Sequence, residues 1–450
     1  MTSPLLTLRF HLLRPYPLAP TPLGPRISRV GSLVISPVTL QALSAPRKLS
    51  QSTGRAFPLP TKSVKGPVHD RRAQLLAHRI PAEREIDLKQ IMDDLRDLEL
   101  LDVLSKVSPK SGSGYKDATR ALYPLFYQAQ GKDAKCTFAE LQKALPPLYG
   151  LAWLAISDRL LSGSIPKLQE LSETDKAALR FLQIYNIGPA RALDFAYAGC
   201  RSFEDLLKWP EDQKPKLAHA HKVGLKHRED INRLIPREEM DALKEALQEA
   251  VYAANFDFEC EILGSYRRGV PFSNDVDLAI WHKSFDGSKE RDALGKELLE
   301  SVVQKLEERG LVEKENELAR GVKKYAGLVR LPGSSHYGRI DVRLAPYLSY
   351  PYMLLGSTGD SLLMKLLRYT AKQKGWCLNE YGMGDKYDAV DQNPNGFRPN
   401  TFKVVTSERK IFELLELPYL SPTERNFRFW GPKYLREVTN PKLRDFVAKL

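Results

Sequence analysis

Residues 264–280 read GSYRRGVPFSNDVDLAI, which places a Gly-Ser pair and two arginines shortly before two aspartates and an apolar run. Side chains two residues apart share one face of a β-strand, so Asp275 and Asp277 are predicted to lie side by side. Two such carboxylates repel each other by roughly 4 kcal/mol at 4 Å when the effective dielectric constant is about 20. A divalent cation relieves this repulsion, and carboxylate oxygens suit Mg²⁺. The stretch therefore predicts a magnesium site at the start of a strand.

A second stretch, RIDVRL at 339–344, alternates in the same way. It places Arg339, Asp341 and Arg343 on one face, so a third carboxylate stands between two arginines. Three aspartates on adjacent strands can hold two Mg²⁺ ions for in-line phosphoryl transfer. The predicted catalytic and metal-binding set is Asp275, Asp277 and Asp341.

Groups suited to bind phosphate oxygens precede the first aspartate. Gly264 and Ser265 supply a tight turn and a hydroxyl, and Arg268 supplies a cation for charge-assisted hydrogen bonds. Ser273 and Asn274 add two more donors. The stretch predicts a triphosphate-binding turn followed by metal ligands. The alternative for any single aspartate is a solvated strand end.

The whole chain has 450 residues, which favours several domains. It is 42% hydrophobic and 27% charged, and no apolar run reaches about 18 residues, which argues against a membrane span. Its four cysteines are scattered and lack zinc-ligand spacing, so neither structural zinc nor a disulfide framework is expected.

The net charge of +13 is concentrated at the N-terminus. Residues 1–69 contain no Asp or Glu and nine Lys or Arg. This composition is typical of a mitochondrial presequence, and mitochondrial localisation is expected. The alternative is a disordered basic tail with a nuclear role.

Periodicity predicts the order of the folded units. Helical spacing of apolar residues begins near residue 86, and residues 86–208 are predicted to be helical. The turn YNIGPA (185–190) separates two of these helices. The helix that begins there would present backbone N–H groups to a DNA phosphate, or the turn is an ordinary helical corner. β-Branched runs after residue 255 predict a mixed sheet with packed helices over 240–345, and a further α/β unit follows.

These motifs together resemble those of the family X DNA polymerases, of the beta and lambda type, in the nucleotidyltransferase superfamily. GSYRRG, DVD and RID carry the resemblance. Four further stretches are similar to segments of the family in the same order: HKVGLKHREDINRLIPREEM (221–240), KYAGLVRLPG (324–333), STGDSLLMKLLRYTAKQKGWCLNEYGM (357–383) and TSERKIFELLELPYLSPTERNF (406–427). The resemblance covers residues 86–430.

The resemblance implies a multidomain α and α+β fold. The expected units are a presequence-like basic segment (1–60), a linker (61–85), a helical lyase-like domain (86–171), a helix-hairpin-helix DNA-binding domain (172–239), a catalytic palm with a mixed sheet (240–345), a small α/β nucleotide-selection domain (346–432) and a C-terminal tail (433–450).

The resemblance also implies roles for individual residues. Asp275, Asp277 and Asp341 would hold two Mg²⁺ ions, with Mn²⁺ as an alternative, and Asp341 would accept the proton of the primer 3′-hydroxyl. Arg343 would pair with Asp277 and support its geometry. The nucleotide-binding positions are Gly264, Ser265, Arg268, Ser273, Asn274, Gly356, Ser357, Thr358 and Gly359. The DNA-binding positions are Ile184, Asn186, Ile187, Gly188, Arg339 and Arg368.

The implied function is a DNA-directed DNA polymerase that fills short gaps in repair. Its expected partners are gapped or nicked double-stranded DNA and dNTPs, with rNTPs accepted as well, and a monovalent cation at the helix-hairpin-helix. A monomer without membrane association or BRCT-mediated partners is expected. The alternatives are a template-independent terminal transferase and a non-catalytic DNA-end-binding subunit. The connection EKENELARG (313–321) is short, which favours template use, and the three carboxylates favour catalysis.

Several positions depart from the family pattern. Ala155 stands where the lyase lysine is expected, and without an amine no imine forms, so lyase activity is expected to be lost. Lys143 or Lys167 is the alternative amine. Leu234 replaces a cation that touches the triphosphate, and Arg233 is the residue that could compensate.

A further departure concerns the sugar. Gly356 and Ser357 replace a Tyr-Phe pair that crowds the 2′ position of the incoming nucleotide, and glycine widens the backbone options there. Tolerance of ribonucleotides is therefore expected. The alternative is that Tyr352 or Leu355 swings in and restores the steric gate.

Overall fold

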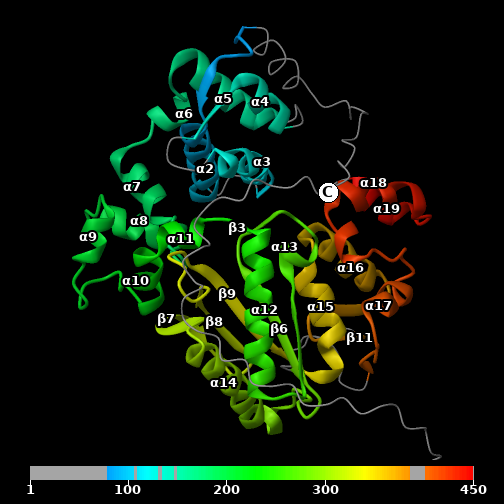
Figure 1. The fold of residues 1–450 in the computed structure, drawn as a ribbon. Helices are drawn as coiled ribbons and strands as arrows, with labels where there is room; N and C mark the ends of the chain where they lie inside the picture. Colours follow the sequence, from blue (N-terminus) through cyan, green and yellow to red (C-terminus); the bar gives the residue numbers. More distant parts are fainter. Residues whose placement is uncertain (1–78, 106–108, 130–133, 146–148, 386–400, 449–450) are drawn as a thin grey trace, which may run out of the picture. The chain divides into compact units, whose positions relative to one another are not determined.

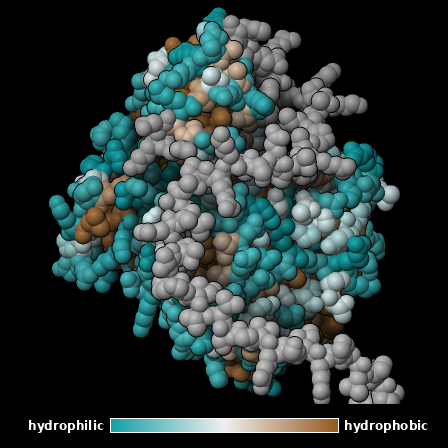
Figure 2. Space-filling model, in the orientation of Figure 1, coloured by the Kyte–Doolittle hydropathy of each residue, from teal (hydrophilic) through white to brown (hydrophobic). Residues whose placement is uncertain are grey.

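The computed structural model describes residues 79–105, 109–129, 134–145, 149–385 and 401–448. The presequence-like segment 1–60 lies outside these residues. Within the described part, no helix combines the length and the apolar character needed to cross a membrane. The face seen in Figure 2 is mostly hydrophilic over the described residues.

The first unit is helical, as predicted, apart from one short antiparallel strand pair. Leu88, Ile91, Leu95 and Leu98 recur at helical spacing and are all buried, so α2 lies at the centre of this core. The elements are β1 (Glu85–Asp87), α2 (Leu88–Leu104), α3 (Pro109–Gln128), β2 (Lys135–Thr137), α4 (Phe138–Ala144), α5 (Gly150–Ser162) and α6 (Pro166–Gln169).

The second unit is built from short helices around its own core. Ser172 and Asp175 form a capping box that begins the first of them. The helices are α7 (Glu173–Phe181), α8 (Pro189–Tyr197), α9 (Phe203–Leu207), α10 (His219–Lys226) and α11 (Arg228–Asn232).

A five-stranded mixed sheet in the order β4-β6-β9-β8-β7 follows (Figure 1). Its strands are β4 (Phe258–Ile262), β6 (Val276–His282), β7 (Val312–Arg320), β8 (Lys324–Val329) and β9 (Gly338–Ala345). The central pair β6 and β9 is parallel, and the other pairs are antiparallel. The segment expected to be a connection, 313–321, instead belongs almost entirely to β7, so only residues 321–323 join β7 to β8.

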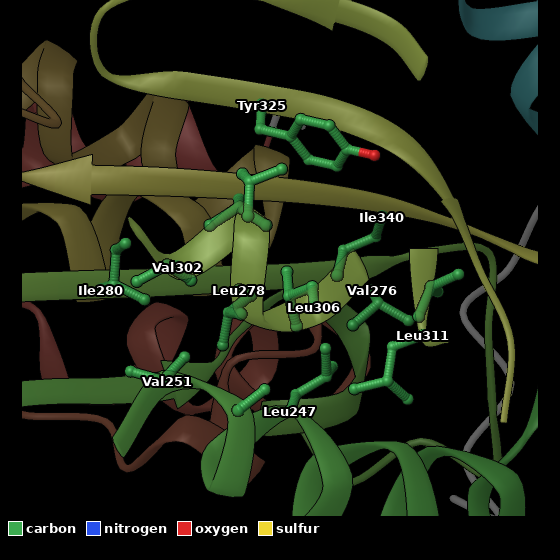
Figure 3. Close-up of a cluster of buried hydrophobic side chains, with 14 of the residues drawn as sticks. Leu247, Val251, Val276, Leu278, Ile280, Val302, Leu306, Leu311, Tyr325 and Ile340 are labelled. Atoms are coloured by element: carbon green, nitrogen blue, oxygen red, sulfur yellow. The ribbon is translucent and has the colours of Figure 1, made fainter. Parts of the chain in front are cut away.

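Two helices, α12 (Arg237–Ala254) and α14 (Asp292–Glu308), cover one face of the sheet. Alternate residues of β6 point toward them, because side chains along a strand alternate between its faces. Figure 3 shows where helix and strand side chains meet in this core: Leu247, Val251, Val276, Leu278, Ile280, Val302, Leu306 and Ile340. The intervening side chains of β6 therefore face away from α12 and α14.

Smaller elements flank the sheet. β3 (Ile235–Pro236) pairs with β5 (Phe272–Ser273), and α13 (Gly264–Arg267) lies between β4 and β5 in the chain. The C-terminal unit contains α15 (Tyr350–Thr358), α16 (Ser361–Gln373), the hairpin β10 (Trp376–Asn379) and β11 (Gly382–Asp385), α17 (Glu408–Leu414), α18 (Phe427–Glu437) and α19 (Pro441–Ala448). The described part of the predicted tail, 433–448, packs as part of this unit, since Tyr434, Leu443 and Val447 share its core.

Candidate active site

Asp277 and Asp341 face each other across the parallel strand pair. The two residues are register partners of β6 and β9. Partners in register project from the same face of a sheet, and here it is the face away from α12 and α14. Asp341 is buried, with 8% of its surface exposed. The structure thus brings together two of the three predicted catalytic carboxylates.

The electrostatics of this pair favour a bound cation. Burial and, after it, the neighbouring charge of Asp341 raise the pKa of Asp277 to about 6, against the opposing charges of Arg343, Arg268 and Lys324. Oδ1 of Asp341 is buried, and the ammonium of Lys324 forms an ion pair with it at 3.2 Å. A buried carboxylate oxygen that already attracts a cation, beside a second carboxylate, suits a hard divalent cation such as Mg²⁺. Both residues therefore fit the predicted metal.

Asp275 is placed differently from the prediction. It precedes β6, outside the paired strand, and its carboxylate forms an ion pair with the guanidinium of Arg339. That guanidinium also lies 5.6 Å from the ring centroid of Tyr185. As a result, no three potential metal-ligating side chains of the described ranges are grouped closely enough to hold a metal ion.

Gly264 makes room for the Asp277 carboxylate. It begins α13 with φ of +59°, a conformation that side chains disfavour, and a Cβ atom added there would collide with Oδ2 of Asp277. The backbone N–H of Leu263 donates to the carbonyl of Asp277 at 2.7 Å. Of the other predicted phosphate-binding residues, Ser265 is half-buried, Ser273 is buried and Asn274 is exposed.

Arg268 connects the Gly-Ser turn to the C-terminal unit. Its Nε donates to Oδ1 of Asn426 at 3.0 Å, and its Nη1 donates to the carbonyl of Thr358. Burial lowers the pKa of its guanidinium. The predicted triphosphate cation therefore contacts the Thr-Gly turn that the sequence assigns to the same nucleotide.

A buried ionic network beside it was missed by sequence reasoning. Arg267 donates to both carboxylate oxygens of Glu408, at 3.0 and 2.9 Å, and to the hydroxyl of Thr358 at 3.0 Å. The fully buried Arg425 also pairs with Glu408. Hydrogen bonds from Arg267 and both positive charges outweigh burial and lower the pKa of Glu408. Arg267 lies 141 residues before Glu408 and 91 residues before Thr358 in the chain, so no local pattern reveals these contacts.

Gly356 and Ser357 lie near the end of α15. A Cβ atom on Gly356 would approach Glu380 at 3.4 Å, an ordinary contact, and the hydroxyl of Ser357 lies 3.4 Å from Sδ of Met353. Tyr352 is 1% exposed and donates its hydroxyl to the carbonyl of Lys403 at 2.6 Å, and Leu355 is fully buried. Neither candidate gate residue can turn toward a sugar without leaving the core.

The turn between α7 and α8 buries two of its four predicted DNA-binding residues. Ile184 and Ile187 are buried in the core of their unit, whereas Asn186 and Gly188 are exposed. Asn186 has φ of +63°, and Gly188 is the N-cap of α8. Arg368 is exposed on α16. The two isoleucines can therefore offer only backbone atoms to a ligand.

The departures from the family pattern have structural counterparts. Ala155 is 5% exposed and belongs to the core of the first unit, while Lys143 and Lys167 are exposed on other helices. Arg233 is held by Glu239 through two hydrogen bonds of 2.9 and 2.7 Å. Arg233 is thus engaged in a pair of its own beside Leu234.

Three cations, Arg343, Arg268 and Lys324, set the charge around the aspartates. Arg343 acts on Asp277 through its charge, since no ion pair joins them within the described part of the chain. Lys324, which sequence reasoning missed, begins β8 opposite Arg343 and places its ammonium 3.2 Å from Oδ1 of Asp341. The signal was the position of Lys324 at the head of KYAGLV, but only the pairing of β8 with β9 brings it to Asp341.

Comparison with protein families gives three matches along the chain. The fingers domain of DNA polymerase lambda matches residues 180–232, the DNA polymerase beta palm matches 234–347 and the DNA polymerase beta thumb matches 353–426. The palm match contains all three aspartates, and the thumb match contains the Thr-Gly turn.

Individual relatives agree with these families. The chain is 30% identical over 281 residues to DNA polymerase lambda of Arabidopsis thaliana, covering 60% of this chain and 51% of the relative. It is 28% identical over 339 residues to DNA polymerase lambda of Rattus norvegicus, covering 73% and 56%. It is 29% identical over 336 residues to DNA-directed DNA/RNA polymerase mu of Homo sapiens, covering 65% and 64%. The chain thus spans between about half and two thirds of the length of these relatives.

Proposed function

Because the chain carries the palm, thumb and fingers domains of the family X DNA polymerases, we propose that it adds nucleotides to the 3′ end of a DNA primer under the direction of a template. The observation that carries this proposal is the in-register pair Asp277 and Asp341 beside the Gly264 turn. A buried and a half-buried carboxylate next to a phosphate-binding turn are the arrangement that phosphoryl transfer needs.

The residues of the chain have distinct roles in this reaction. Asp341 accepts the proton of the primer 3′-hydroxyl, because it is a buried carboxylate directly opposite Asp277. Asp277 and Asp341 would hold Mg²⁺, or Mn²⁺ in its place, with Asp275 joining them once it leaves Arg339. Two such ions, when bound, supply positive charge to the attacking and leaving oxygens.

The incoming nucleotide is held by the surrounding turns. Gly264, Ser265, Arg268, Ser273 and Asn274 bind the triphosphate through a hydroxyl, backbone N–H groups, an amide and a guanidinium. The segment from Gly356 to Gly359 forms the wall beside the sugar and base. Arg268 contacts both parts, since it donates to the Thr358 carbonyl.

The DNA substrate in this proposal is a short gap or a nick. The turn at 184–188 binds backbone phosphates, assisted by a monovalent cation, and Arg339 and Arg368 bind the strands nearer the aspartates. The connection between β7 and β8 is only residues 321–323, which supports template use over template-independent transfer. The chain acts as a monomer in the repair of DNA.

Three finer features belong to the same proposal. Lyase activity is lost, because the Ala155 position carries no amine and lies in a core. Ribonucleotides are accepted, because Gly356 and Ser357 lack the bulk to crowd a 2′-hydroxyl and neither Tyr352 nor Leu355 can replace it. The protein acts in mitochondria, directed by residues 1–60, and a reporter fused to that segment tests this against a nuclear location.

The decisive experiment compares a one-nucleotide gap with a single-stranded primer, each in Mg²⁺ and in EDTA. Metal-dependent filling of the gap is expected, with little extension of the single strand. Asp341→Ala should abolish extension and leave gapped-DNA binding nearly intact, because phosphate contacts dominate affinity. Equal extension of the single strand would indicate a terminal transferase. Binding without extension would indicate a non-catalytic subunit.

A further inference from the structure

The start of the last helix pair contacts both parts of the nucleotide site. Oδ1 of Asn426 accepts a hydrogen bond from Nε of Arg268 at 3.0 Å, and Nδ2 of Asn426 donates to the carbonyl of Arg268 at 3.4 Å. Arg268 in turn donates to the carbonyl of Thr358. The segment that leads into α18 is therefore tied to the predicted triphosphate cation and, through it, to the Thr-Gly turn.

The carboxylate of Asp360 makes the second connection. Asp360 follows that turn and caps α16, where it accepts the N–H of Leu363 at 2.8 Å. It also accepts the backbone N–H of Phe427 at 2.7 Å and the indole Nε1–H of Trp430 at 3.3 Å. The N–H of Asp360 donates to the carbonyl of Arg425 at 3.2 Å. One side chain thus joins the beginning of α16 to the beginning of α18.

The helices behind this connection are firmly packed. Trp430 and Tyr434 are fully buried in the C-terminal core, and the rings of Tyr369 and Phe446 stack with centroids 4.3 Å apart. Gly431 is needed there, because a Cβ atom would come within 2.9 Å of the Phe427 ring. A packed core makes α18 and α19 a rigid anchor rather than a loose end.

The identity of residue 360 suits the helices that follow the thumb match. That match ends at residue 426, just before α18, and residues 358–360 read Thr-Gly-Asp. A serine hydroxyl could still cap α16, but it could not accept two further N–H groups from another helix as a carboxylate does. The aspartate is the residue type that the added helices require.

We propose that Asp360 and Trp430 are positioning residues that hold the Thr-Gly turn and α16 at a fixed place relative to Arg268, so that the C-terminal helix pair sets the affinity for the incoming nucleotide. This inference rests on the nucleotide-binding site of the proposed function and not on the transfer step itself. It affects binding more than chemistry, because the contacts of α18 reach Arg268 and the turn but not the aspartate pair. Without the contacts from Asp360 to Phe427 and Trp430, the Thr-Gly turn can move away from Arg268.

Two variants remove the connection with little other change. Asp360→Ser keeps a capping side chain for α16 and loses the carboxylate, and Trp430→Phe keeps the buried ring and loses the N–H donor. Each should raise the KM for dNTP in gap filling by about three- to tenfold, with kcat changed less than about twofold. The double variant should be no worse than the more severe single one, because both remove the same contact.

The matched control is Tyr434→Phe in the same helix. It removes the buried hydrogen bond from the Tyr434 hydroxyl to the Pro418 carbonyl, so it should lower the Tm and leave the KM unchanged. An unchanged KM in Asp360→Ser and Trp430→Phe would overturn the inference. So would an increase in KM of the same size in Tyr434→Phe at an equal loss of Tm.

A readout without turnover separates this inference from the proposed function. Gapped DNA with a dideoxy-terminated primer, Mg²⁺ and the matched dNTP should raise the Tm of the wild-type protein, and the increase should be smaller in both variants. If the wild-type protein extends no primer but shows this difference, the proposed function fails and the inference stands. Equal increases in all proteins, or none in the wild type, would reject the inference.

Discussion

Replacing Gly264 with alanine should disable the active site while leaving the protein folded. Gly264 has φ of +59°, and the new Cβ atom would collide with Oδ2 of Asp277. The neighbour that must yield is a short, mostly buried carboxylate, whose own strand is held in register with Asp341. The collision therefore moves a predicted metal ligand rather than a flexible surface side chain.

The size of each effect follows from the geometry. A non-glycine residue in the left-handed region costs about 1–2 kcal/mol. That is a fraction of the roughly 5–15 kcal/mol by which domains are stable, so the fold survives. The carboxylate must move by about 1 Å to restore normal contact, and a misplacement of about 1 Å at a reacting centre costs roughly 100-fold in rate. A 100-fold loss corresponds to about 2.7 kcal/mol in the activation free energy.

The assay is single-turnover filling of a one-nucleotide gap at saturating Mg²⁺ and dNTP. Gly333→Ala is the matched control, because Gly333 has φ of +83° and a Cβ atom there would meet nothing within 4 Å. Both variants should lose similar Tm, but only Gly264→Ala should lose the chemical step. A rate for Gly264→Ala within threefold of wild type would refute the reasoning, as would an equal loss in Gly333→Ala.

Three further predictions concern the aspartate pair, the sugar and the lyase. The pKa of Asp277 is raised from an ordinary 3.8 to about 6. Between about pH 4 and pH 6 the folded protein therefore keeps a proton on Asp277 that the unfolded chain has lost, and the contribution of Asp277 to stability falls as the pH rises through this window. Asp277→Asn should therefore raise the Tm in EDTA at pH 8 above that of wild type while abolishing extension, and a lower Tm would contradict this. Wild-type protein should insert ribonucleotides with an efficiency within about tenfold of that for deoxyribonucleotides. Gly356→Tyr should restore a steric clash of about 3–5 kcal/mol and with it several hundredfold discrimination against ribonucleotides. A thousandfold preference of the wild type for deoxyribonucleotides, unchanged by the substitution, would reject the idea. Borohydride should trap little covalent complex with a 5′-deoxyribose-phosphate end, and capture as efficient as that of a lysine-bearing relative would show that another amine replaces Ala155.

The order of elements and the character of the site were predictable from local pattern. The alternation in DVDLAI and RIDVRL places Asp277 and Asp341 on strands and on one face, because the period of a strand is two residues. β7 was missed because EKENELAR is almost entirely polar. β7 is an edge strand of the sheet, and charged residues on such a strand protect its free edge from pairing with other chains.

The amino-acid sequence by itself thus predicted which residues would meet phosphate and metal, and it determined that positions 155, 356 and 357 carry neither a lysine nor a bulky side chain. Only the tertiary structure decided which distant residues these side chains contact. Asp275 is paired with Arg339, Lys324 is brought to Asp341 by the register of β8 and β9, and Asp360 accepts the indole N–H of Trp430. Periodicity assigns a side chain to a face, but it carries no information about which distant residue packs opposite, because strand register and helix docking are set by the whole core.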